Sequence, residues 1–268
     1  MFDKYFEVFL ADTPEGKEIN YRIRYQVYCL ETGYEDPSRY PDRQEVDAFD
    51  EHAVHFIART KPTKEKPNGD WVAALRLVVR PFNSLPLNGY ADVDFNFLAD
   101  EIARDIRNGH ASQCAEVSRM CVVSRFRRRR PERTTPYQVP YDPTRDAPPA
   151  NTSDPSERRK APWLMLGLLN AARDYSETHN IRYWFFLTTG ALARIIEGVG
   201  VGLTVVGPRC EHRGERFPYF LDLNTRYENI ARRLPIVYEM IQQPTCYGLY
   251  SELRDYQDHV PFMASAGR

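Results

Sequence analysis

Three carboxylates lie within six residues in the segment Glu45-Val-Asp47-Ala-Phe-Asp50, and Glu51 follows directly. Such a cluster can bind a metal ion, hold a cationic group such as the ammonium of an amine, or be a solvated acidic loop without a ligand. His52 and His55 add little to a metal site, because residues three apart on a strand point to opposite faces. We expect no metal here, and the cluster alone leaves the other two interpretations open.

A second pair with chemical potential is Glu116 and Arg119, in the segment Glu116-Val-Ser118-Arg119 of a predicted strand. In a regular strand these two side chains would face opposite ways. A bulge between them would bring both into one site, and bulges re-aim side chains next to active sites. Without a bulge, Arg119 would be a structural residue.

A third feature is basic: six arginines fall within nine residues, at Arg125, Arg127–Arg130 and Arg133. A charge run of this kind is usually a solvated face. A polynucleotide site would need aromatic platforms between the basic residues, and Phe126 is the only aromatic inside the run. An acidic protein partner or a phosphate-bearing group fits the arginines better.

The segments that must position these residues alternate between strand-like and helix-like patterns. Predicted strands are Tyr5–Ala11, Ala53–Arg59, Trp71–Arg80, Glu116–Arg125, Ile181–Thr188, Leu203–Val206 and Tyr219–Leu223; predicted helices are Glu15–Leu30, Ala99–Asn108, Pro162–Asn180, Gly190–Gly198 and Thr225–Gln242. Their order implies an α/β (α+β) fold with a mixed central sheet and helices on both faces. We expect one domain over residues 1–268, with a proline- and arginine-rich insertion at about 127–161 that carries seven of the 20 prolines.

Composition excludes several classes of protein. The 268 residues have a net charge of −1, which argues against a nucleic-acid binder. The longest apolar run, Pro162–Leu169, is far shorter than the ~20 residues that a membrane-spanning helix needs. The start shows no apolar secretory signal, and the five cysteines show no CxxC spacing. We therefore expect a cytoplasmic protein with reduced thiols.

The charged residues occur in an order that resembles the acyl-homoserine lactone (autoinducer) synthases. The matching positions are Arg24, Tyr28, Tyr34, Glu45, Asp47, Asp50, Arg76, Glu116 and Arg119. That family has an acyltransferase fold of the GNAT type (the acyl-CoA N-acyltransferase fold) with an ExDxxD motif, an ExxR pair and conserved arginines. Tyr28 and Tyr34 depart from it, because they stand where the family usually has Phe and Trp. Those aromatics shape the adenosylmethionine pocket in autoinducer synthases.

A closer resemblance is to the acyltransferase group associated with exosortase/PEP-CTERM systems, which is related to the N-acyl amino acid synthases. It rests on the wording RYQVYCLETGYE from Arg24 to Glu35, on the opening YFEVFLADT and on SRMCVVSRFRRR. The resemblance covers residues ~5–130 well. Coenzyme-A-dependent relatives hold the pyrophosphate on a glycine-containing loop, whereas here the strand runs into SRFRRRRPERT without glycine. The resemblance therefore implies an acyl carrier protein, rather than coenzyme A, as the donor.

These observations together predict transfer of an acyl group from an acyl-thioester to a small amine such as an amino acid. Glu116 is the candidate base, with Arg119 as its partner. Glu45, Asp47 and Asp50 would hold the acceptor's ammonium, with Arg24, Arg76, Tyr28 and Tyr34 completing the acceptor site. Backbone N–H groups of Met120, Cys121 and Val122 would stabilise the oxyanion, and Arg127, Arg128 and Arg129 would contact the donor. No cofactor is expected besides the donor substrate.

Alternatives remain at this stage. Buried arginine–carboxylate networks also simply hold folds together. The same fold could make acyl-homoserine lactones from adenosylmethionine, or the chain could be a non-catalytic binding module that uses its arginine-rich insertion. The apolar residues of Trp163–Leu169 and Tyr183–Phe186 could line an acyl tunnel, or they could be core.

Overall fold

The computed structural model describes residues 5–108, 114–126, 161–198, 201–224 and 247–259. The strands are β1 (Phe6–Leu10), β2 (Ala53–Thr60), β3 (Trp71–Val79), β4 (Cys114–Val122), β5 (Tyr183–Thr188), β6 (Thr204–Val205), β7 (Cys210–Glu211), β8 (Glu215–Asp222) and β9 (Gly248–Leu249). The α-helices are α1 (Pro14–Tyr25), α2 (Asp100–Arg107), α4 (Ala161–Thr178), α5 (Gly190–Gly198) and α8 (Tyr250–His259). The predicted insertion and the predicted helix Thr225–Gln242 lie almost entirely outside the described residues.

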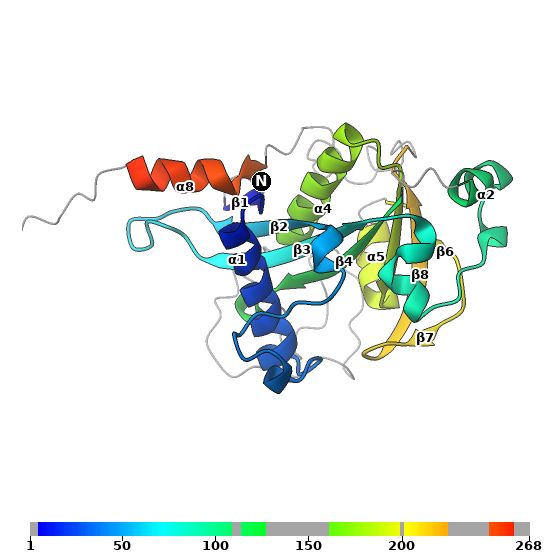
Figure 1. Ribbon diagram of the computed structural model, residues 1–268, viewed down its shortest axis with the longest axis horizontal. Coiled ribbons are helices and arrows are strands. Elements are labelled where there is room, and N and C mark those ends of the chain that lie inside the picture. The colour runs from blue at the N-terminus through cyan, green and yellow to red at the C-terminus, as the bar shows by residue number, and fades with distance from the viewer. Residues whose placement is uncertain (1–4, 109–113, 127–160, 199–200, 225–246, 260–268) are drawn as a thin grey trace, which may run out of the picture.

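The strands form one mixed sheet in the order β6-β8-β5-β4-β3-β2-β1-β9, with β7 paired to β8 (Figure 1). Neighbours from β1 to β4 are antiparallel, whereas β4 and β5 run parallel. The connection between these two parallel strands includes α4, as a parallel crossover requires. The predicted mixed sheet with helices on both faces is therefore confirmed.

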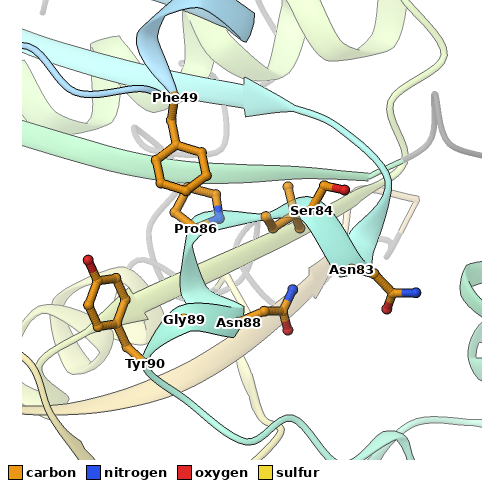
Figure 2. Close-up of a pocket in the computed structure, with 8 residues that line it drawn as sticks. Phe49, Asn83, Ser84, Pro86, Asn88, Gly89 and Tyr90 are labelled. Atoms are coloured by element: carbon orange, nitrogen blue, oxygen red, sulfur yellow. The ribbon is translucent and has the colours of Figure 1, made fainter.

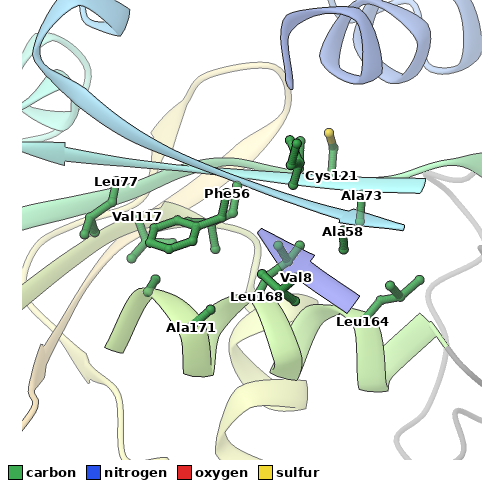
Figure 3. Packing of buried hydrophobic residues seen from close by; sticks show 14 of the residues in the cluster. Val8, Phe56, Ala58, Ala73, Leu77, Val117, Cys121, Leu164, Leu168 and Ala171 are labelled. Atoms are coloured by element: carbon green, nitrogen blue, oxygen red, sulfur yellow. The ribbon is translucent and has the colours of Figure 1, made fainter. Parts of the chain in front are cut away.

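Two helices cover opposite faces of the sheet centre (Figure 3). On one face, Leu164, Leu168 and Ala171 of α4 pack toward Phe56 and Val117 of the strands. The opposite face carries α1, which begins with Thr13 as its N-cap and Pro14 in its first turn. Because side chains alternate along a strand, Glu116 and Ser118 face away from α4. The charged residues of β3 and β4 therefore project toward the α1 side.

The segment after α1 departs from the prediction of one continuous helix to Leu30. From Gln26 to Glu31 the chain is a π-helix, which ends where Thr32 N–H and Oγ1–H both donate to Val27 O. Such segments are often found at functional sites, because the wider turn re-aims side chains. Here it carries Tyr28, one of the predicted site residues.

None of the described helices combines the length and the hydrophobicity that a membrane crossing requires.

Candidate active site

Arg24 on α1 holds two of the three clustered carboxylates. Its Nε donates to Glu45 Oε2 over 2.6 Å, and its Nη1 and Nη2 donate to Asp50 Oδ1 and Oδ2 over 2.6 and 3.0 Å. The planar guanidinium makes this fork possible, which an ammonium could not reproduce. All three side chains are buried, so this part of the network is a fixed base for the loop that contains it.

Arg76 joins that acidic loop to the sheet. Its Nη1 lies 2.6 Å from Asp47 Oδ1 and 3.1 Å from Asp50 Oδ1, and its Nε donates to Ser118 Oγ over 3.1 Å. Because Ser118 lies opposite Arg76 in the β3–β4 register, the arginine spans from β4 to the acidic loop.

Arg119 approaches the same carboxylates from β4, through a bulge. Ala74 pairs with Cys121 and Arg76 with Ser118, so Arg119 and Met120 lie opposite the single residue Leu75. Arg119 has a positive φ of 50°, and its guanidinium donates to Glu45 Oε1 over 3.1 Å and to Asp47 Oδ2 over 2.9 Å. The expected bulge is present, but Arg119 and Met120 themselves form it, because alternation stays regular from Glu116 through Ser118.

Burial separates the roles of the three acids. Glu45 is fully buried and the Asp50 side chain is 3% exposed, whereas the Asp47 side chain is 27% exposed. Burial raises the pKa of Asp47 and Asp50, but the neighbouring guanidinium groups outweigh it and hold both pKa values below the ordinary range. Both acids are therefore ionised at neutral pH, and Asp47 is the one that a ligand can reach.

The structure places four predicted acceptor-binding residues beneath the surface. Arg24, Glu45, Asp50 and Arg76 are at most 3% exposed, and their ion pairs join them to other members of the network. A direct contact with an acceptor would require breaking buried ion pairs, which is costly. Their place in the structure is that of positioning residues beneath Asp47 and Arg119.

Glu116 lies on the same side of β4 and is 3% exposed. Burial raises the pKa of this carboxyl to about 7, against the opposing effects of the Leu87 N–H and of the Arg76 and Arg119 charges. The Leu87 N–H donates to Glu116 Oε2 over 2.7 Å. A carboxylate with a pKa near neutrality suits a general base, because it exists deprotonated and still accepts a proton.

The two parallel strands β4 and β5 separate close to Glu116. Their pairing runs from Cys114↔Tyr183 to Val117↔Phe186, although β4 continues to Val122 and β5 to Thr188. On this side of β4 the backbone beyond Val117 therefore has no β5 partner. An unpaired strand edge of this kind can receive an extended substrate that bonds to its backbone.

The predicted oxyanion donors differ in direction. Val123 N–H donates to Val72 O of the segment paired with β4. Because antiparallel bonds alternate along a strand, the N–H of Cys121 also points toward β3, and that of Val122 points to the open edge. The Cys121 thiol is buried in the core, and Met120 O accepts from Tyr28 Oη–H over 3.2 Å. Val122 is thus the best placed of the three, whereas Cys121 is directed away.

The two predicted aromatics lie together beside the bulge. The rings of Tyr28 and Tyr34 stack at 6.5 Å between centroids, and Arg119 lies 5.8 Å from the Tyr28 ring centre. Tyr28 is bonded to the bulge and burial raises its pKa, whereas Tyr34 is 42% exposed. Tyr28 therefore supports the bulge from the π-helical segment, and Tyr34 is the accessible member of the pair.

Sequence reasoning missed several members of the site. Arg213, in the turn between β7 and β8, forms an ion pair with Glu35, which also lies 3.9 Å from Arg119. Glu35 is the last residue of the motif Arg24–Glu35, so the sequence could have indicated it as a site residue. Nothing in the sequence relates it to Arg213, 178 positions away. His55, considered only for a metal, lies 3.8 Å from Asp50 Oδ1, and burial lowers its pKa to about 4.

Other predicted features are placed as follows. Arg127, Arg128 and Arg129 lie outside the described residues. Of the predicted tunnel residues, Trp184 and Phe186 line a small cavity of about 50 Å³ with α4, whereas Tyr183 and Phe185 lie in a core cluster on the other face. Within the described ranges, no group of three or more His, Cys, Asp or Glu is arranged to hold a metal ion.

An open hollow of about 430 Å³ adjoins the charged network. Phe49, from the acidic loop, forms one wall, and the segment between Asn83 and Tyr90 forms the rest (Figure 2). Phe49 N–H donates to Asp47 Oδ1 over 2.9 Å, and the N–H of Leu87, which is buried behind the lining residues Pro86 and Asn88, donates to Glu116. We refer to this hollow as the Phe49 pocket.

Comparison with known proteins finds a match to one protein family. Residues 23–135 match the family described as acetyltransferase (GNAT) domain, a span that contains all the predicted site residues. Among curated proteins, none matches this sequence.

Solved structures extend the likeness to most of the chain. TofI, crystallised in a ternary complex with an inhibitor and MTA, is 16% identical, with a TM-score of 0.52 over 86% of this chain and 99% of its own. The AHL synthase LasI is 12% identical, with a TM-score of 0.50 over 86% and 94%. The CoA-dependent acyl-homoserine lactone synthase BjaI, solved with SAM and isopentyl-CoA, is 15% identical, with a TM-score of 0.50 over 91% and 92%. The chain therefore has the GNAT-like fold that its sequence predicts, and the domain match supports an acyltransferase.

Proposed function

We propose that this protein is an N-acyltransferase that moves a fatty acyl group from an acyl-thioester to a small amine acceptor such as an amino acid. The observation that carries this proposal is the position of Glu116. It is a buried carboxyl with a pKa of about 7, close enough to the partly exposed Asp47 to be affected by its charge, and next to the point where the pairing of β4 with β5 ends. The candidate base, the amine-binding group and the unpaired edge of β4 thus lie within one region of the sheet.

The reaction begins when Asp47 binds the acceptor's ammonium. Glu116, directly or through a water molecule, takes a proton from it, and the neutral amine attacks the thioester carbonyl. The carbonyl oxygen becomes an oxyanion that backbone N–H groups at the open edge of β4, with Val122 best directed, would stabilise. That first proton is released to solvent. The new C–N bond forms, Glu116 takes the second proton from the positively charged nitrogen of the tetrahedral intermediate, the C–S bond breaks, and this proton passes from Glu116 to the departing thiolate. No cofactor is needed for these steps.

The proposed donor is an acyl carrier protein in the cytoplasm. The absence of glycine in SRFRRRRPERT, directly after β4, supports a carrier protein over coenzyme A. The proposal includes an association with exosortase/PEP-CTERM systems, which is supported by the sequence resemblance of residues ~5–130.

Product analysis tests the reaction. The full chain is incubated with acyl carrier protein or coenzyme A thioesters, together with either a panel of amino acids or adenosylmethionine, and products are identified by mass spectrometry. N-acyl amino acids are the expected products. Acyl-homoserine lactone would establish the alternative autoinducer synthase activity. No thioester consumption with any acceptor would contradict an enzyme and favour a binding module.

Asp47→Asn is expected to weaken acceptor binding more than catalysis. Loss of the charge removes a charge-assisted hydrogen bond to the ammonium, so KM for the acceptor should rise about 10–100-fold with kcat little changed. Steady-state kinetics with varied acceptor measure this split. Asp42→Asn, an exposed acid before the same loop, is the control and should leave KM unchanged. A fall in kcat at constant KM would remove Asp47 from acceptor binding.

The triple variant Arg127→Ala, Arg128→Ala, Arg129→Ala tests the carrier. Acyl carrier proteins are acidic, so these guanidinium groups should steer the encounter and lose effect as salt rises. At low salt, kcat/KM for the carrier-bound donor should fall roughly tenfold or more, equivalent to ~1.4 kcal/mol. Turnover of a short acyl-pantetheine should change little. Equal losses with both donors would assign the arginines to the chemistry instead of the carrier.

A further inference from the structure

The Phe49 pocket is connected to both carboxylates that the proposed reaction uses. On one wall, the backbone N–H of Phe49 donates to Asp47 Oδ1, so this lining residue is tied to the proposed ammonium site. Behind the other wall, the buried Leu87, which lies in the chain between the lining residues Pro86 and Asn88, donates its N–H to Glu116 Oε2 over 2.7 Å. Figure 2 shows the Phe49 ring pointing from its loop toward Pro86 across the hollow. Both wall segments are therefore hydrogen-bonded to the carboxylates that would act on the amine, and the side chain of a molecule whose amine lies at Asp47 can extend toward the pocket.

The lining of the pocket carries no Asp, Glu, Lys, Arg or His. Phe49, Leu85 and Pro86 supply apolar surface, and Asn83, Ser84 and Asn88 supply neutral hydrogen-bonding groups. A charged group placed among these residues would find no partner of opposite charge in the lining and would lose part of its hydration. A neutral group would bury apolar area and still find hydrogen bonds for an amide or hydroxyl.

The turn between β7 and β8 contacts the pocket at the lining residue Tyr90. The Tyr90 ring lies on the His212 ring, with 3.8 Å between centroids. Burial, followed by the charges of Arg119 and Arg216, lowers the pKa of His212, so this ring is mostly neutral at pH 7. The neighbouring Arg213 is paired with Glu35. This turn therefore brings no unpaired charge to the pocket.

We propose that the Phe49 pocket binds the side chain of the acceptor and selects acceptors whose side chain is uncharged. The inference rests on the proposed N-acyltransferase function and names its substrate class: a primary amine, such as an α-amino acid, with a neutral side chain of medium size. At about 430 Å³ the pocket has the size of ordinary small-molecule sites. Asp47 then recognises the amine, and the pocket distinguishes one amine from another.

Gly89 offers a way to fill the pocket without disturbing the fold. It lines the pocket, and a Cβ placed there would meet no atom within 4 Å. Gly202, before β6, has the same open surroundings and does not line this pocket. Gly89→Phe and Gly202→Phe are therefore a matched pair, in which only the first reduces the pocket volume.

The experiment compares acceptors of similar size and different charge. With the wild-type chain, kcat/KM for glutamine should exceed that for glutamate, and methionine should exceed lysine, each by about tenfold or more. Gly89→Phe should lower kcat/KM for glutamine and methionine at least tenfold while glycine, which has no side chain to place, is little affected. Gly202→Phe should behave as wild type with all five acceptors.

The outcomes separate the two proposals. Acyl transfer without preference for neutral side chains, or without an effect of Gly89→Phe, would overturn the pocket assignment and leave the proposed function in place. Failure of the wild type to acylate any amine would overturn the proposed function. Saturation-transfer NMR of methionine and lysine with the wild type and Gly89→Phe then still tests the pocket, because methionine binding that Gly89→Phe weakens is expected from it, and equal binding to both chains contradicts it.

Discussion

Glu116→Gln is expected to reduce kcat by ~10²–10⁴-fold, the usual contribution of a general base. Glutamine keeps the shape and can still accept the hydrogen bond from Leu87 N–H, but it cannot take a proton. Donor binding and the melting temperature should be almost unchanged. Glu51→Gln, at a carboxyl whose side chain is 83% exposed, is the matched control and should retain full turnover. A loss below about threefold in Glu116→Gln would exclude Glu116 from the mechanism.

The pH dependence of this pair gives a second test. The pKa of Glu116 is raised to about 7, so the wild-type rate should increase as pH rises through about 7, when the base loses its proton. Glu116→Gln should lack this limb, whereas a limb from the acceptor's own ammonium should remain in both proteins. A limb near pH 7 that survives the substitution would assign the base to another group.

The free energy of unfolding should change with pH in the opposite direction from the rate: it should fall as Glu116 loses its proton. A carboxyl whose folded-state pKa is raised contributes most at low pH and less as pH rises through its folded value. The buried Glu116 charge therefore disfavours folding above about pH 7. Glu116→Gln should be at least as stable as wild type at pH 8 in urea unfolding, which separates a lost base from a damaged fold.

Arg24→Ala is expected to lower the free energy of unfolding by ~3–5 kcal/mol, because it leaves Glu45 and Asp50 buried without their guanidinium partner. Arg22→Ala is the control on the same helix. Its side chain is 63% exposed and pairs only with Glu18 at the surface, so the loss should stay below ~0.5 kcal/mol. Urea unfolding followed by circular dichroism measures both.

Arg24→Ala should also change how the free energy of unfolding depends on pH in the acid range. Arg24 is the main group that holds the pKa of Asp50 below its ordinary range, so wild-type Asp50 contributes stability above its ordinary pKa of 3.8 that is lost as pH falls. In Arg24→Ala this pH dependence should be weaker. Equal stabilities of Arg24→Ala and Arg22→Ala at pH 7 would show that the buried network is not important for folding.

Much of the architecture follows from local patterns in the chain. Largely apolar runs predicted β2 and β3 to within one residue at each end, and α4 and α5 were also predicted as helices. The start of β8 was placed four residues too late, because Pro218 reads as a break in a strand. In the sheet Pro218 pairs with Leu187, and its carbonyl accepts from Val206. The short β9 and α8 gave no such pattern and were missed.

The charged residues of the site were also found from sequence, because Arg24, Glu45, Asp47, Asp50, Arg76, Glu116 and Arg119 form a recognisable series. The sequence did not indicate which of these residues are buried and which a ligand can reach. Residue type gave Glu45, Asp47 and Asp50 equal standing, whereas packing buries two of them on Arg24 and leaves Asp47 at the surface. Burial depends on what α1, β3 and β4 place around a side chain, and no segment of sequence contains that information.

The sequence by itself therefore determined the order of the longer strands and helices and the chemical groups available, because both depend on residue type and short-range patterns. Only the tertiary structure decided that Arg119 and Met120 form the bulge, that Glu116 has a pKa near 7, and that Arg213 joins Glu35 across the chain. It also decided where the Phe49 pocket lies. Register, desolvation and contacts between distant segments arise from packing, and they turn a set of charged residues into a site.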